Sequence, residues 1–317
     1  MEIAIVSDIH GNLPALLEVL RDAGKRGIDR FIFAGDYCLS GAWPDECIRV
    51  LRDISHKKIV RGNEERYLED LIGKDQSTWT DGQMQISYWN YRNIGKDNLE
   101  AMFSWPERLE FAENGVKIHV AHSSDLFLGE YEFGKIGPGI LAKRYKDSEV
   151  TPDILRHDIS EILDHDPVFQ KRVSGLEEGV YIFGHSHVQW SYGSPEKNVL
   201  LINPGSCGLP LDAIMDSIPY SVLSVTENGE TKLEEIRLQF SKQEYVEALK
   251  KSSQYTEAKV WSEVIIKELL TAREHLVFFL NFAEKYAQEI GDTERPFKVS
   301  TWEDAFNAWK QAGDRTW

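Results

Sequence analysis

Seven side chains of the kinds that bind metal ions follow short apolar runs at five places in the chain. In chain order they are Asp8, His10, Asp36, Asn63, His122, His185 and His187. The runs before them, such as "IAIV" and "YIFG", are typical of buried strands. One Asp-x-His at a strand end is a common polar turn. Five such strand ends predict one shared site, because the carboxyl ends of strands in an open α/β sheet lie along one edge.

The residue types indicate a site for two metal ions. Two divalent cations about 3.5–4 Å apart need a bridging carboxylate with nitrogen and oxygen ligands around each ion. In an extended segment, residues two positions apart project to the same side, so Asp8 with His10 could serve one small volume. The same holds for His185 with His187. Four glycines beside these residues would allow close approach of the backbone to the ions: Gly11, Gly35, Gly62 and Gly184.

The ligand types also restrict which metal is expected. The seven residues include no thiolate, which argues against a structural zinc site. A mixture of imidazole, carboxylate and amide suits manganese, iron, zinc or cobalt.

The first sixty residues alternate between strand and helix patterns. We expect strands at 2–8, 30–36 and 57–63 and amphipathic helices at 13–24 and 44–54. The unbroken apolar character of the strands indicates a parallel sheet that is covered on both faces and has right-handed crossovers.

The middle of the chain has a different organisation. Helical insertions are expected at about 65–110 and 124–178, on either side of a strand that ends near His122. From 179 to 240 strands follow one another without helices, and Asn228-Gly229 predicts a hairpin turn. This part of the sheet structure is therefore expected to be antiparallel or mixed.

After Phe240 the pattern is helical to the end. We therefore expect a catalytic domain over 1–240 and a helical extension over 241–317. The string "STWEDAFNAWK" starts with a capping pattern, and Trp302 and Trp309 would share one helix face. The extension is expected to pack on the core or on a second copy of the chain rather than to act in catalysis.

The composition limits the partners of the protein. The 317 residues carry a net charge of −16, and the pI is near 5.1. Such a surface repels polyanions, so nucleic-acid polymers and anionic membranes are not expected partners. Three cysteines without a C-x-x-C spacing, and a start that leads directly into a strand, predict a cytoplasmic protein with reduced thiols.

The sequence resembles the calcineurin-like metallophosphoesterase superfamily. The blocks "DIH", "GD", "GN", "H" and "GHSH" occur in that family's order and approximate spacing across residues 1 to about 240. The resemblance implies a four-layer α/β/β/α sandwich of two mixed sheets, here with the C-terminal helical extension. It also implies two divalent or trivalent transition-metal ions, with manganese or iron favoured. One ion would take Asp8, His10, Asp36 and His187, and the other Asp36, Asn63, His122 and His185, with Asp36 as the bridge.

The resemblance also implies a reaction. "DIHGNLPAL" and "INPGSCGLP" are most similar to the prokaryotic branch that holds small phosphodiesterases, and also to enzymes that hydrolyse diadenosine polyphosphates. We therefore expect hydrolysis of a phosphodiester or phosphoanhydride in a small substrate, with a nucleotide as the first candidate. The two ions would polarise the phosphoryl oxygens and make hydroxide available near neutral pH.

Glu64 departs from the family pattern, which commonly has a histidine there that assists the leaving group. A glutamate near two cations would be ionised and a poor proton donor. This favours phosphoanhydrides or activated diesters, whose leaving groups need little help from a proton, over alkyl monoesters. His157 or His165 could supply the proton instead.

Three further residues are candidates for catalysis or substrate binding. Arg61 matches an arginine that contacts phosphate in related protein phosphatases, although a surface arginine at a strand end is the alternative. Asn63 is expected to act in catalysis as well as in metal binding. Asn12 could hydrogen-bond near the ions, but as a turn residue it needs no such role. His119 is out of phase with the ligands and is expected to be packed.

Two questions stay open at the level of sequence. Trp79, Tyr88, Trp89 and Tyr91 could stack on a base or could form the core of a cap subdomain. A binding or scaffold protein that keeps the fold without turnover is the rival to an enzyme; Glu64 favours it and the complete ligand set opposes it. A protein phosphatase is a weaker alternative, because "GDYCLSG" lacks the Asp-Arg-Gly continuation.

Overall fold

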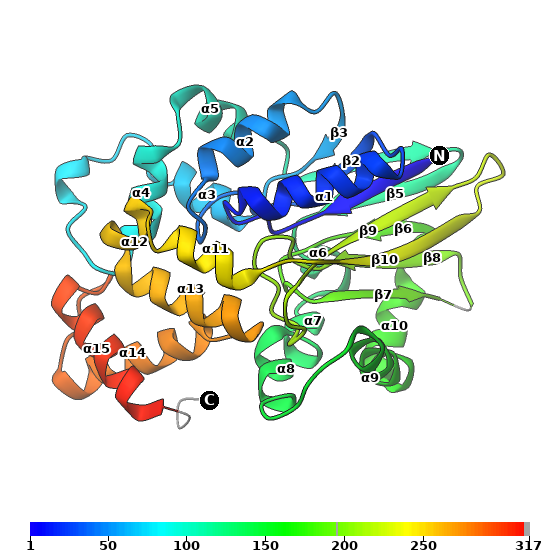
Figure 1. The fold of residues 1–317 in the computed structure, drawn as a ribbon. Helices are drawn as coiled ribbons and strands as arrows, with labels where there is room; N and C mark the ends of the chain where they lie inside the picture. Colours follow the sequence, from blue (N-terminus) through cyan, green and yellow to red (C-terminus); the bar gives the residue numbers. More distant parts are fainter. Residues whose placement is uncertain (195, 314–317) are drawn as a thin grey trace.

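The structure is a computed structural model and describes residues 1–194 and 196–313. Its centre consists of two five-stranded sheets (Figure 1). The first contains β1 (Glu2–Val6), β2 (Arg30–Phe33), β3 (His56–Ile59), β9 (Ser217–Val225) and β10 (Thr231–Gln239). The second contains β4 (Arg108–Glu113), β5 (Val116–Ala121), β6 (Gly179–Ile182), β7 (Gln189–Gly193) and β8 (Val199–Pro204).

Both sheets are mixed, as expected. The first has the order β10-β9-β1-β2-β3, in which β1, β2 and β3 are parallel and β9 and β10 are antiparallel to their neighbours. The second has the order β4-β5-β6-β8-β7, with a parallel centre and two antiparallel edges. The predicted hairpin turn joins β9 to β10, and Gly229 there has a φ of 79°.

Helices cover the outer faces of the two sheets. Those nearest the sheets are α1 (Leu13–Lys25), α2 (Pro44–Asp53), α9 (Pro152–His165) and α10 (Pro167–Gly175). Along β1, Val6 packs in the same buried cluster as Leu16 of α1, whereas Ile5 packs with Ile182 of the other sheet. This alternation follows from the two-residue period of a strand. A third buried cluster joins α9 and α10 to the second sheet, which completes the four-layer sandwich.

Two short strands were not expected from the sequence. β4 begins inside the stretch predicted as helical, and its residues alternate between exposed and half-buried. β7 follows the GHSH block directly. Both are edge strands that pair antiparallel with one neighbour, β5 and β8 respectively. They form through this pairing, which a reading of local propensity does not detect.

The two insertions are mainly helical. The first contains α3 (Asn63–Glu69), a 3-10 turn η1 (Gln76–Thr78), α4 (Gln85–Asn93) and α5 (Lys96–Ser104). The second begins with α6 (Asp125–Leu128), α7 (Tyr131–Lys135) and α8 (Pro138–Arg144), which precede α9 and α10.

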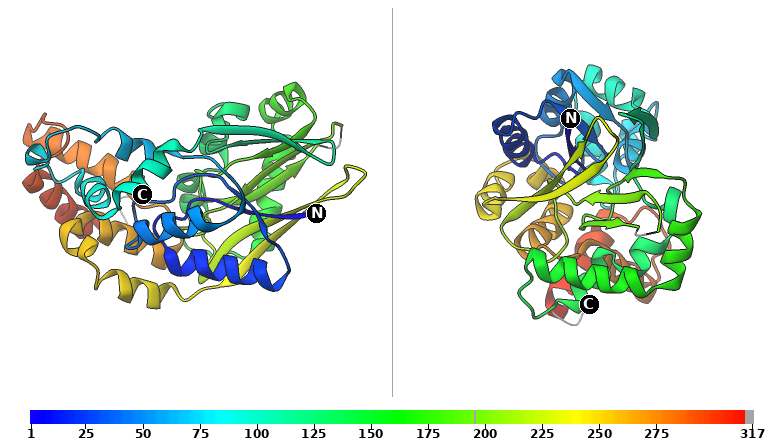
Figure 2. Two further views of the ribbon diagram at one scale, coloured as in Figure 1. Left: turned by 90° about the horizontal axis from the view of Figure 1, so that it is seen from above. Right: turned by 90° about the vertical axis from the view of Figure 1, so that its right-hand side faces the viewer.

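The C-terminal extension is a compact set of helices. It contains α11 (Lys242–Leu249), α12 (Ser253–Glu257), α13 (Lys259–Thr271), α14 (Leu276–Ile290) and α15 (Val299–Ala312). Figures 1 and 2 show α13, α14 and α15 at the end of the sandwich that lies away from the N-terminus. The amphipathic run is divided into two helices at Ala272, whose backbone is left-handed with a φ of 50°.

The extension has a core of its own and also packs on the rest of the chain. Trp302 and Trp309 lie on one face of α15, as predicted, and both pack on Phe279 of α14. The predicted capping pattern is wrong: α15 begins at Val299 without a side-chain cap, and Ser300 lies inside the helix. Residues of α13 such as Ile265 belong to the main core. Pairing with a second copy of the chain stays a prediction.

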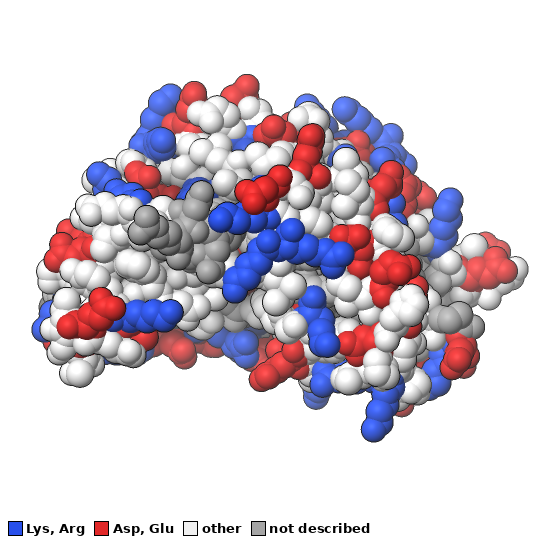
Figure 3. Space-filling view, turned by 90° about the horizontal axis from the view of Figure 1, so that it is seen from below, with Lys and Arg blue, Asp and Glu red and all other residues white. Residues whose placement is uncertain are grey.

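Surface charge, helix length and the state of the cysteines relate to the predicted partners and location of the protein. Figure 3 shows lysine and arginine side chains among acidic ones on one face of the molecule. In the part of the chain that the structure describes, every helix is too short or too polar to cross a lipid bilayer. The three cysteines, Cys38, Cys47 and Cys207, are buried and have free thiols.

Candidate metal centre

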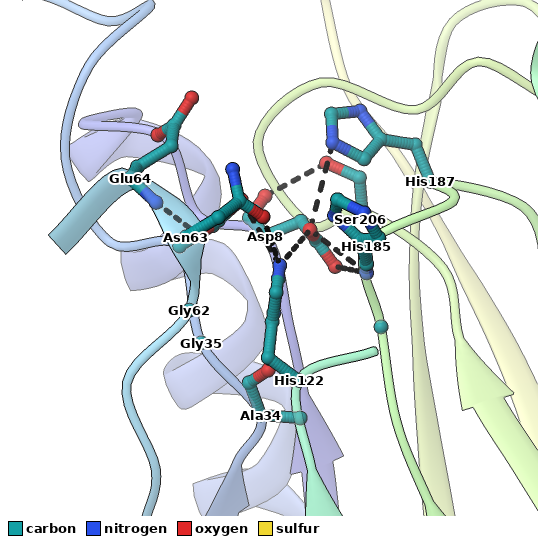
Figure 4. Close-up of polar contacts among 12 residues, drawn as sticks. Asp8, Ala34, Gly35, Gly62, Asn63, Glu64, His122, His185, His187 and Ser206 are labelled. Atoms are coloured by element: carbon teal, nitrogen blue, oxygen red, sulfur yellow. Dashed lines mark hydrogen bonds and ion pairs between the residues drawn. The ribbon is translucent and has the colours of Figure 1, made fainter. Parts of the chain in front are cut away.

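The seven candidate ligands meet where strands of both sheets end. Figure 4 shows this for Asp8, Asn63, His122, His185 and His187. Six of the seven form two groups within which all ligand atoms lie within 4.8 Å of one another, and a further group of this kind joins His10 and Asp36 to Glu64. The first consists of Asp8, His10 and His187, and the second of Asp36, His122 and His185. This division agrees with the two ligand sets that the family resemblance implies. Their role as metal ligands stays a prediction.

The first group is arranged around two facing imidazole nitrogens. His10 Nε2 lies 2.9 Å from His187 Nε2, and Asp8 Oδ1 lies 3.9 and 3.5 Å from these two atoms. The Nδ1 atoms are held by acceptors, Glu64 Oε2 at 2.9 Å for His10 and the Leu209 carbonyl at 2.8 Å for His187. Burial lowers the pKa of both rings, which are therefore neutral. Nδ1 of His187 carries the proton, because the Leu209 carbonyl can only accept, so Nε2 of His187 presents a lone pair toward His10 Nε2.

This pair of nitrogens fits a bound cation. Nε2 of both rings lies close to Asp8 Oδ1, so a metal ion here would be bound by two imidazole nitrogens and a carboxylate oxygen. The carboxylate that holds His10 Nδ1 is also typical of metal sites, where a second acceptor fixes the tautomer and orientation of a ligating histidine.

In the second group a protonated His122 lies beside Asp36, where a metal ion would otherwise balance the charge of the carboxylate. His122 Nδ1 donates to the Ala34 carbonyl at 2.7 Å, and Nε2 lies 3.1 Å from Asp36 Oδ2 and 3.1 Å from Asn63 Oδ1. Burial by itself lowers the pKa of His122, but the charge of Asp36 and the hydrogen bond to it raise this pKa to about 10. Burial also lowers the pKa of His185 to about 4. Asp36 would accept a metal ion in place of that proton.

Asp8 and Asp36 respond differently to burial. Burial raises the pKa of Asp8 to about 6, and the charge of Asp36 adds to this rise. Burial also disfavours the charged form of Asp36, but the charge of His122, the hydrogen bond to it and the charges of His10 and His185 together keep the pKa of Asp36 below its usual value. Two adjacent buried carboxyl groups that repel each other would both be stabilised in the ionised form by cations.

The backbone around the ligands is strained. Five ligands have left-handed φ angles between 51° and 70°: Asp8, His10, Asp36, His185 and His187. The expected extended geometry of the two pairs is therefore wrong, because the chain turns sharply after each strand. Amide hydrogen bonds such as Asp8 N to the Gly35 carbonyl hold these turns. Each such residue costs about 1–3 kcal/mol and persists where surrounding structure fixes it, as is common at functional sites.

Two glycines let the strand ends approach each other. A Cβ atom on Gly62 would lie 2.0 Å from Asp36 Oδ1, and one on Gly184 would lie 1.9 Å from Ser7 Oγ. Both distances are far below van der Waals contact. These glycines are therefore needed for close packing beside the ligands, as the sequence analysis expected.

Two positioning residues were missed in the sequence. Glu65 is fully buried, and its carboxylate accepts hydrogen bonds from the amides of Asp36, Tyr37 and Gly62 at 3.0, 2.7 and 2.6 Å. It lies three residues after Gly62, the N-cap residue of α3, and this capping-box spacing could have identified it. Ser206 donates to the Asp8 carbonyl at 2.7 Å, and no local pattern indicated this contact.

The two residues predicted to contact substrate make hydrogen bonds or ion pairs with other parts of the chain. Asn12 is fully buried; its side chain caps α1 by accepting from Ala15 N and donates to the Gly208 carbonyl, and its predicted contact with substrate stays a prediction. The Arg61 guanidinium binds Glu69 at 2.7 Å and Glu107 at 3.3 Å. Arg61 also lines an open groove together with Asn63, His122 and His185, and its phosphate contact stays a prediction.

The aromatic residues of the first insertion pack on one another. Trp79 stacks on Tyr88 with ring centroids 4.7 Å apart, and Tyr91 meets Trp79 edge-on. Trp89 is 3% exposed and donates to Ser253 Oγ. The structure therefore favours the interpretation that these rings form a packed subdomain core rather than a base-stacking platform.

The other histidines have structural environments. His119 stacks on Tyr181 with ring centroids 4.5 Å apart, which matches the expected packing role. His157 and His165 are exposed on α9 and are absent from the described lining of the cavity beside the ligand groups. They are therefore not placed to protonate a leaving group there.

That cavity has a volume of about 440 Å³ and opens on both ligand groups. Ligand residues including His10, Asp36 and His185 form one wall. Trp261 of α13 and Val277 of α14 are part of the opposite wall, so the C-terminal extension shapes the site. The sequence analysis did not expect this, because nothing in a helical pattern indicates which distant residues its outer face meets.

Comparison with known proteins assigns the family. The sequence model described as calcineurin-like phosphoesterase matches residues 1–189. The chain belongs to this family. Family membership and the two Asp/His groups support a metal-dependent phosphoesterase, since the family uses a dinuclear metal centre.

The individual similar proteins agree with this fold. The uncharacterized protein MJ0912 of Methanocaldococcus jannaschii is 28% identical over 254 residues, which cover 75% of this chain and 87% of that protein. A metallophosphoesterase from Sphaerobacter thermophilus superposes with a TM-score of 0.56 and 20% identity, over 86% of this chain and 100% of that one. The hypothetical protein PH1004 from Pyrococcus horikoshii superposes with a TM-score of 0.55 and 17% identity, over 86% of this chain and 99% of that one.

Proposed function

We propose that this phosphoesterase hydrolyses a phosphodiester or phosphoanhydride with two transition-metal ions, manganese or iron, held by the two Asp/His groups. The observation that carries the proposal is the pair of Nε2 atoms of His10 and His187, which face each other at 2.9 Å. Bound ions would act as Lewis acids on the phosphoryl group and would make water a nucleophile near neutral pH. Asp36, between the groups, would be shared by the two ions.

Residues of the chain orient this site before substrate binds. Glu64 and the Leu209 carbonyl fix the rings of His10 and His187, and the Ala34 carbonyl fixes His122. These contacts present Nε2 of each ring to the site. Preorganised ligands need little rearrangement during the reaction, which is the main source of electrostatic catalysis.

Access from two sides supports a substrate with two substituents on phosphorus. On one side lies the 440 Å³ cavity, and on the other an open groove whose lining includes Arg66 and Arg108. Asn63 and His185 line both. We propose a nucleotide as the substrate class, with its charged part along the arginines of the groove and the other substituent in the cavity.

The position of Glu64 favours good leaving groups. Burial raises the pKa of Glu64 well above its usual value, and cations bound nearby would lower it again. Its carboxylate binds His10 Nδ1, so it is oriented toward a ligand rather than toward a departing oxygen. We therefore propose that anhydrides and activated diesters react faster than alkyl monophosphates. Equal turnover of an alkyl monophosphate and a dinucleoside polyphosphate would contradict this preference.

The direct test measures hydrolysis of bis-p-nitrophenyl phosphate with added manganese. The parent is expected to turn over, and Asp36→Asn is expected to lose at least about a thousandfold in rate together with bound metal, because the shared carboxylate is gone. Asp29→Asn, whose side chain is 74% exposed, is the matched control and should behave as the parent. A parent that binds two metal ions but hydrolyses neither diesters nor anhydrides would favour the scaffold alternative.

A further inference from the structure

We propose that the C-terminal helices are a substrate-specificity element, and that the cavity they close receives an uncharged, apolar organic group of the phosphoester. This inference rests on the proposed function, because the metal groups are taken to hold the phosphoryl end. It adds the chemical class of the substituent and assigns a role to residues 259–290.

The wall opposite the metal groups is apolar. Trp261 and Ile265 come from α13, and Leu276, Val277 and Leu280 come from α14. Further apolar side chains from the first insertion and from the segment after β8 complete it, including Met84, Ile86, Leu209 and Leu211. Transfer of apolar surface from water into such an environment is favourable in proportion to the area buried.

The charged groups in the cavity disfavour an anionic substituent. The described residues that line it include neither lysine nor arginine, and its charged residues are carboxylic acids. Asp36 and Glu64 lie at the metal end and Glu268 and Glu274 in the wall formed by α13 and α14. A second phosphate or carboxylate here would lose hydration and would gain no cationic partner. The groove on the other side of the metal groups differs, since Arg66 and Arg108 line it.

The two acids in the wall formed by α13 and α14, here called the helical wall, accept hydrogen bonds from backbone amides. Glu268 Oε1 accepts from the amides of His275 and Leu276 at 2.8 and 2.7 Å, and Glu274 Oε1 accepts from Val277 N at 2.8 Å. These contacts satisfy amides at the start of α14, which otherwise lack partners. The acids therefore fix the corner between α13 and α14, and with it Leu276 and Val277, instead of recruiting a cationic ligand.

The size of the cavity suits such a substituent. Pockets for small organic molecules are about 300–1,000 Å³. A volume of about 440 Å³ is sufficient for an aryl or branched alkyl group next to a phosphoryl group. The cavity is continuous with the metal groups, so its occupant is part of the molecule bound there.

The test compares two phosphonates of nearly equal shape, whose C–P bond resists hydrolysis. The probes are 3-methylbutylphosphonate and 2-carboxyethylphosphonate, and their binding to the manganese-loaded full chain is measured by calorimetry. The parent is expected to bind the branched alkyl probe at least about tenfold more tightly, since it buries apolar area where the carboxylate finds only acids.

The variant Val277→Lys tests whether the alkyl group of the probe binds in the cavity beside α14. Val277 is 50% exposed, so the substitution places a cation at the cavity without opening a core, and it should reduce the preference for the alkyl probe at least about fivefold. Ile290→Lys is the matched control on the same helix, 54% exposed and absent from the cavity lining, and should keep the parental preference. Equal binding of both probes by the parent, or an unchanged preference in Val277→Lys, would overturn the inference.

Turnover separates this inference from the proposed function. Hydrolysis of bis-p-nitrophenyl phosphate by the parent without any preference between the probes refutes the cavity assignment alone. A clear preference with no hydrolysis of any diester or anhydride refutes the enzymatic proposal and leaves the cavity assignment standing.

Discussion

Two parts of the molecule meet at the candidate site and are built in opposite ways. The loops at the strand ends are polar and strained, with five ligand residues in left-handed backbone conformations. The C-terminal helices are regular and apolar, with a core formed around Phe279 and Trp302. The loops place atoms for chemistry, where sub-ångström geometry matters. The helices form the cavity wall, whose apolar area and lack of cationic side chains among the described residues determine which substituent binds.

This difference shows how the two properties can be encoded separately. In four of the five loops a glycine and a polar ligand residue are adjacent, so a single substitution can disturb them; in the fifth, His122 follows Ala121. The helical wall lies more than fifty residues beyond the GHSH block and contacts the site with only one of its faces. Substrate preference could therefore change by substitution in α13 or α14 while the ligand groups stay intact.

Among the variants that compare the two parts, Gly62→Ala has the largest expected effect and tests the strained loops. The added Cβ would lie 2.0 Å from Asp36 Oδ1, so either the carboxylate or the backbone must move. A displacement of about 1 Å at a catalytic group costs about a hundredfold in rate, and we expect at least this loss in phosphodiester hydrolysis. Gly24→Ala is the control, since its Cβ would meet nothing within 4 Å. A fully active Gly62→Ala variant would show that the close approach is dispensable.

A smaller effect is expected for Glu64→Gln, which separates orientation of His10 from proton donation. The amide can still accept from His10 Nδ1, but without the negative charge that strengthens the ligand. We expect about 10–100-fold weaker binding of one of two metal ions, measured by titration, because loss of such a partner has effects of this size. Glu18→Gln, on the surface of α1, should bind both ions as the parent does.

The pH dependence distinguishes the two roles of Glu64. If its carboxylate only orients His10, excess metal should restore most of the rate of Glu64→Gln at every pH. A rate that stays low at saturating metal and loses its alkaline limb would instead identify Glu64 as the proton donor.

The strand-end positions could be predicted from the sequence because each combines two local signals. An apolar run of strand length ends at a polar residue, and five repetitions of this pattern fix the common edge. The conformation of those residues could not be predicted, since an extended and a left-handed Asp8 have the same local sequence. The positions of the Asn12 and Arg61 side chains were equally hidden: each is determined by partners elsewhere, Gly208 and Glu107 respectively.

The helical wall shows the other limit of sequence analysis. An amphipathic pattern says that one face of a helix is buried, but Ile265, in the main core, and Val264, in the extension's own core, are neighbours in one helix. Which face meets the cavity depends on how α13 and α14 are oriented by their corner. That corner depends on Glu268, whose contacts with the start of α14 span seven and eight residues.

The smallest expected effect is on stability and concerns this corner. Burial and the adjacent Glu274 raise the pKa of Glu268 well above its ordinary value of 4.5. The folded chain therefore keeps a proton that the unfolded chain releases, and this contribution to stability falls as the pH rises above 4.5. Glu268→Gln keeps the acceptor oxygen and removes the titration. Relative to the parent, its free energy of unfolding should increase by about 1–2 kcal/mol between pH 5 and pH 8.

Denaturant unfolding at several pH values measures this difference, with Glu289→Gln on the exposed side of α14 as the control without a trend. If the difference in unfolding free energy between Glu268→Gln and the parent stays flat or shrinks with rising pH, the folded parent does not keep the extra proton on Glu268. Affinity for metal should be unchanged in Glu268→Gln, because Glu268 makes its contacts within the helical wall. Glu268→Gln would then change the stability of the corner between α13 and α14 without changing metal binding by the ligand loops. This outcome would show directly that the helices and the loops can be altered independently.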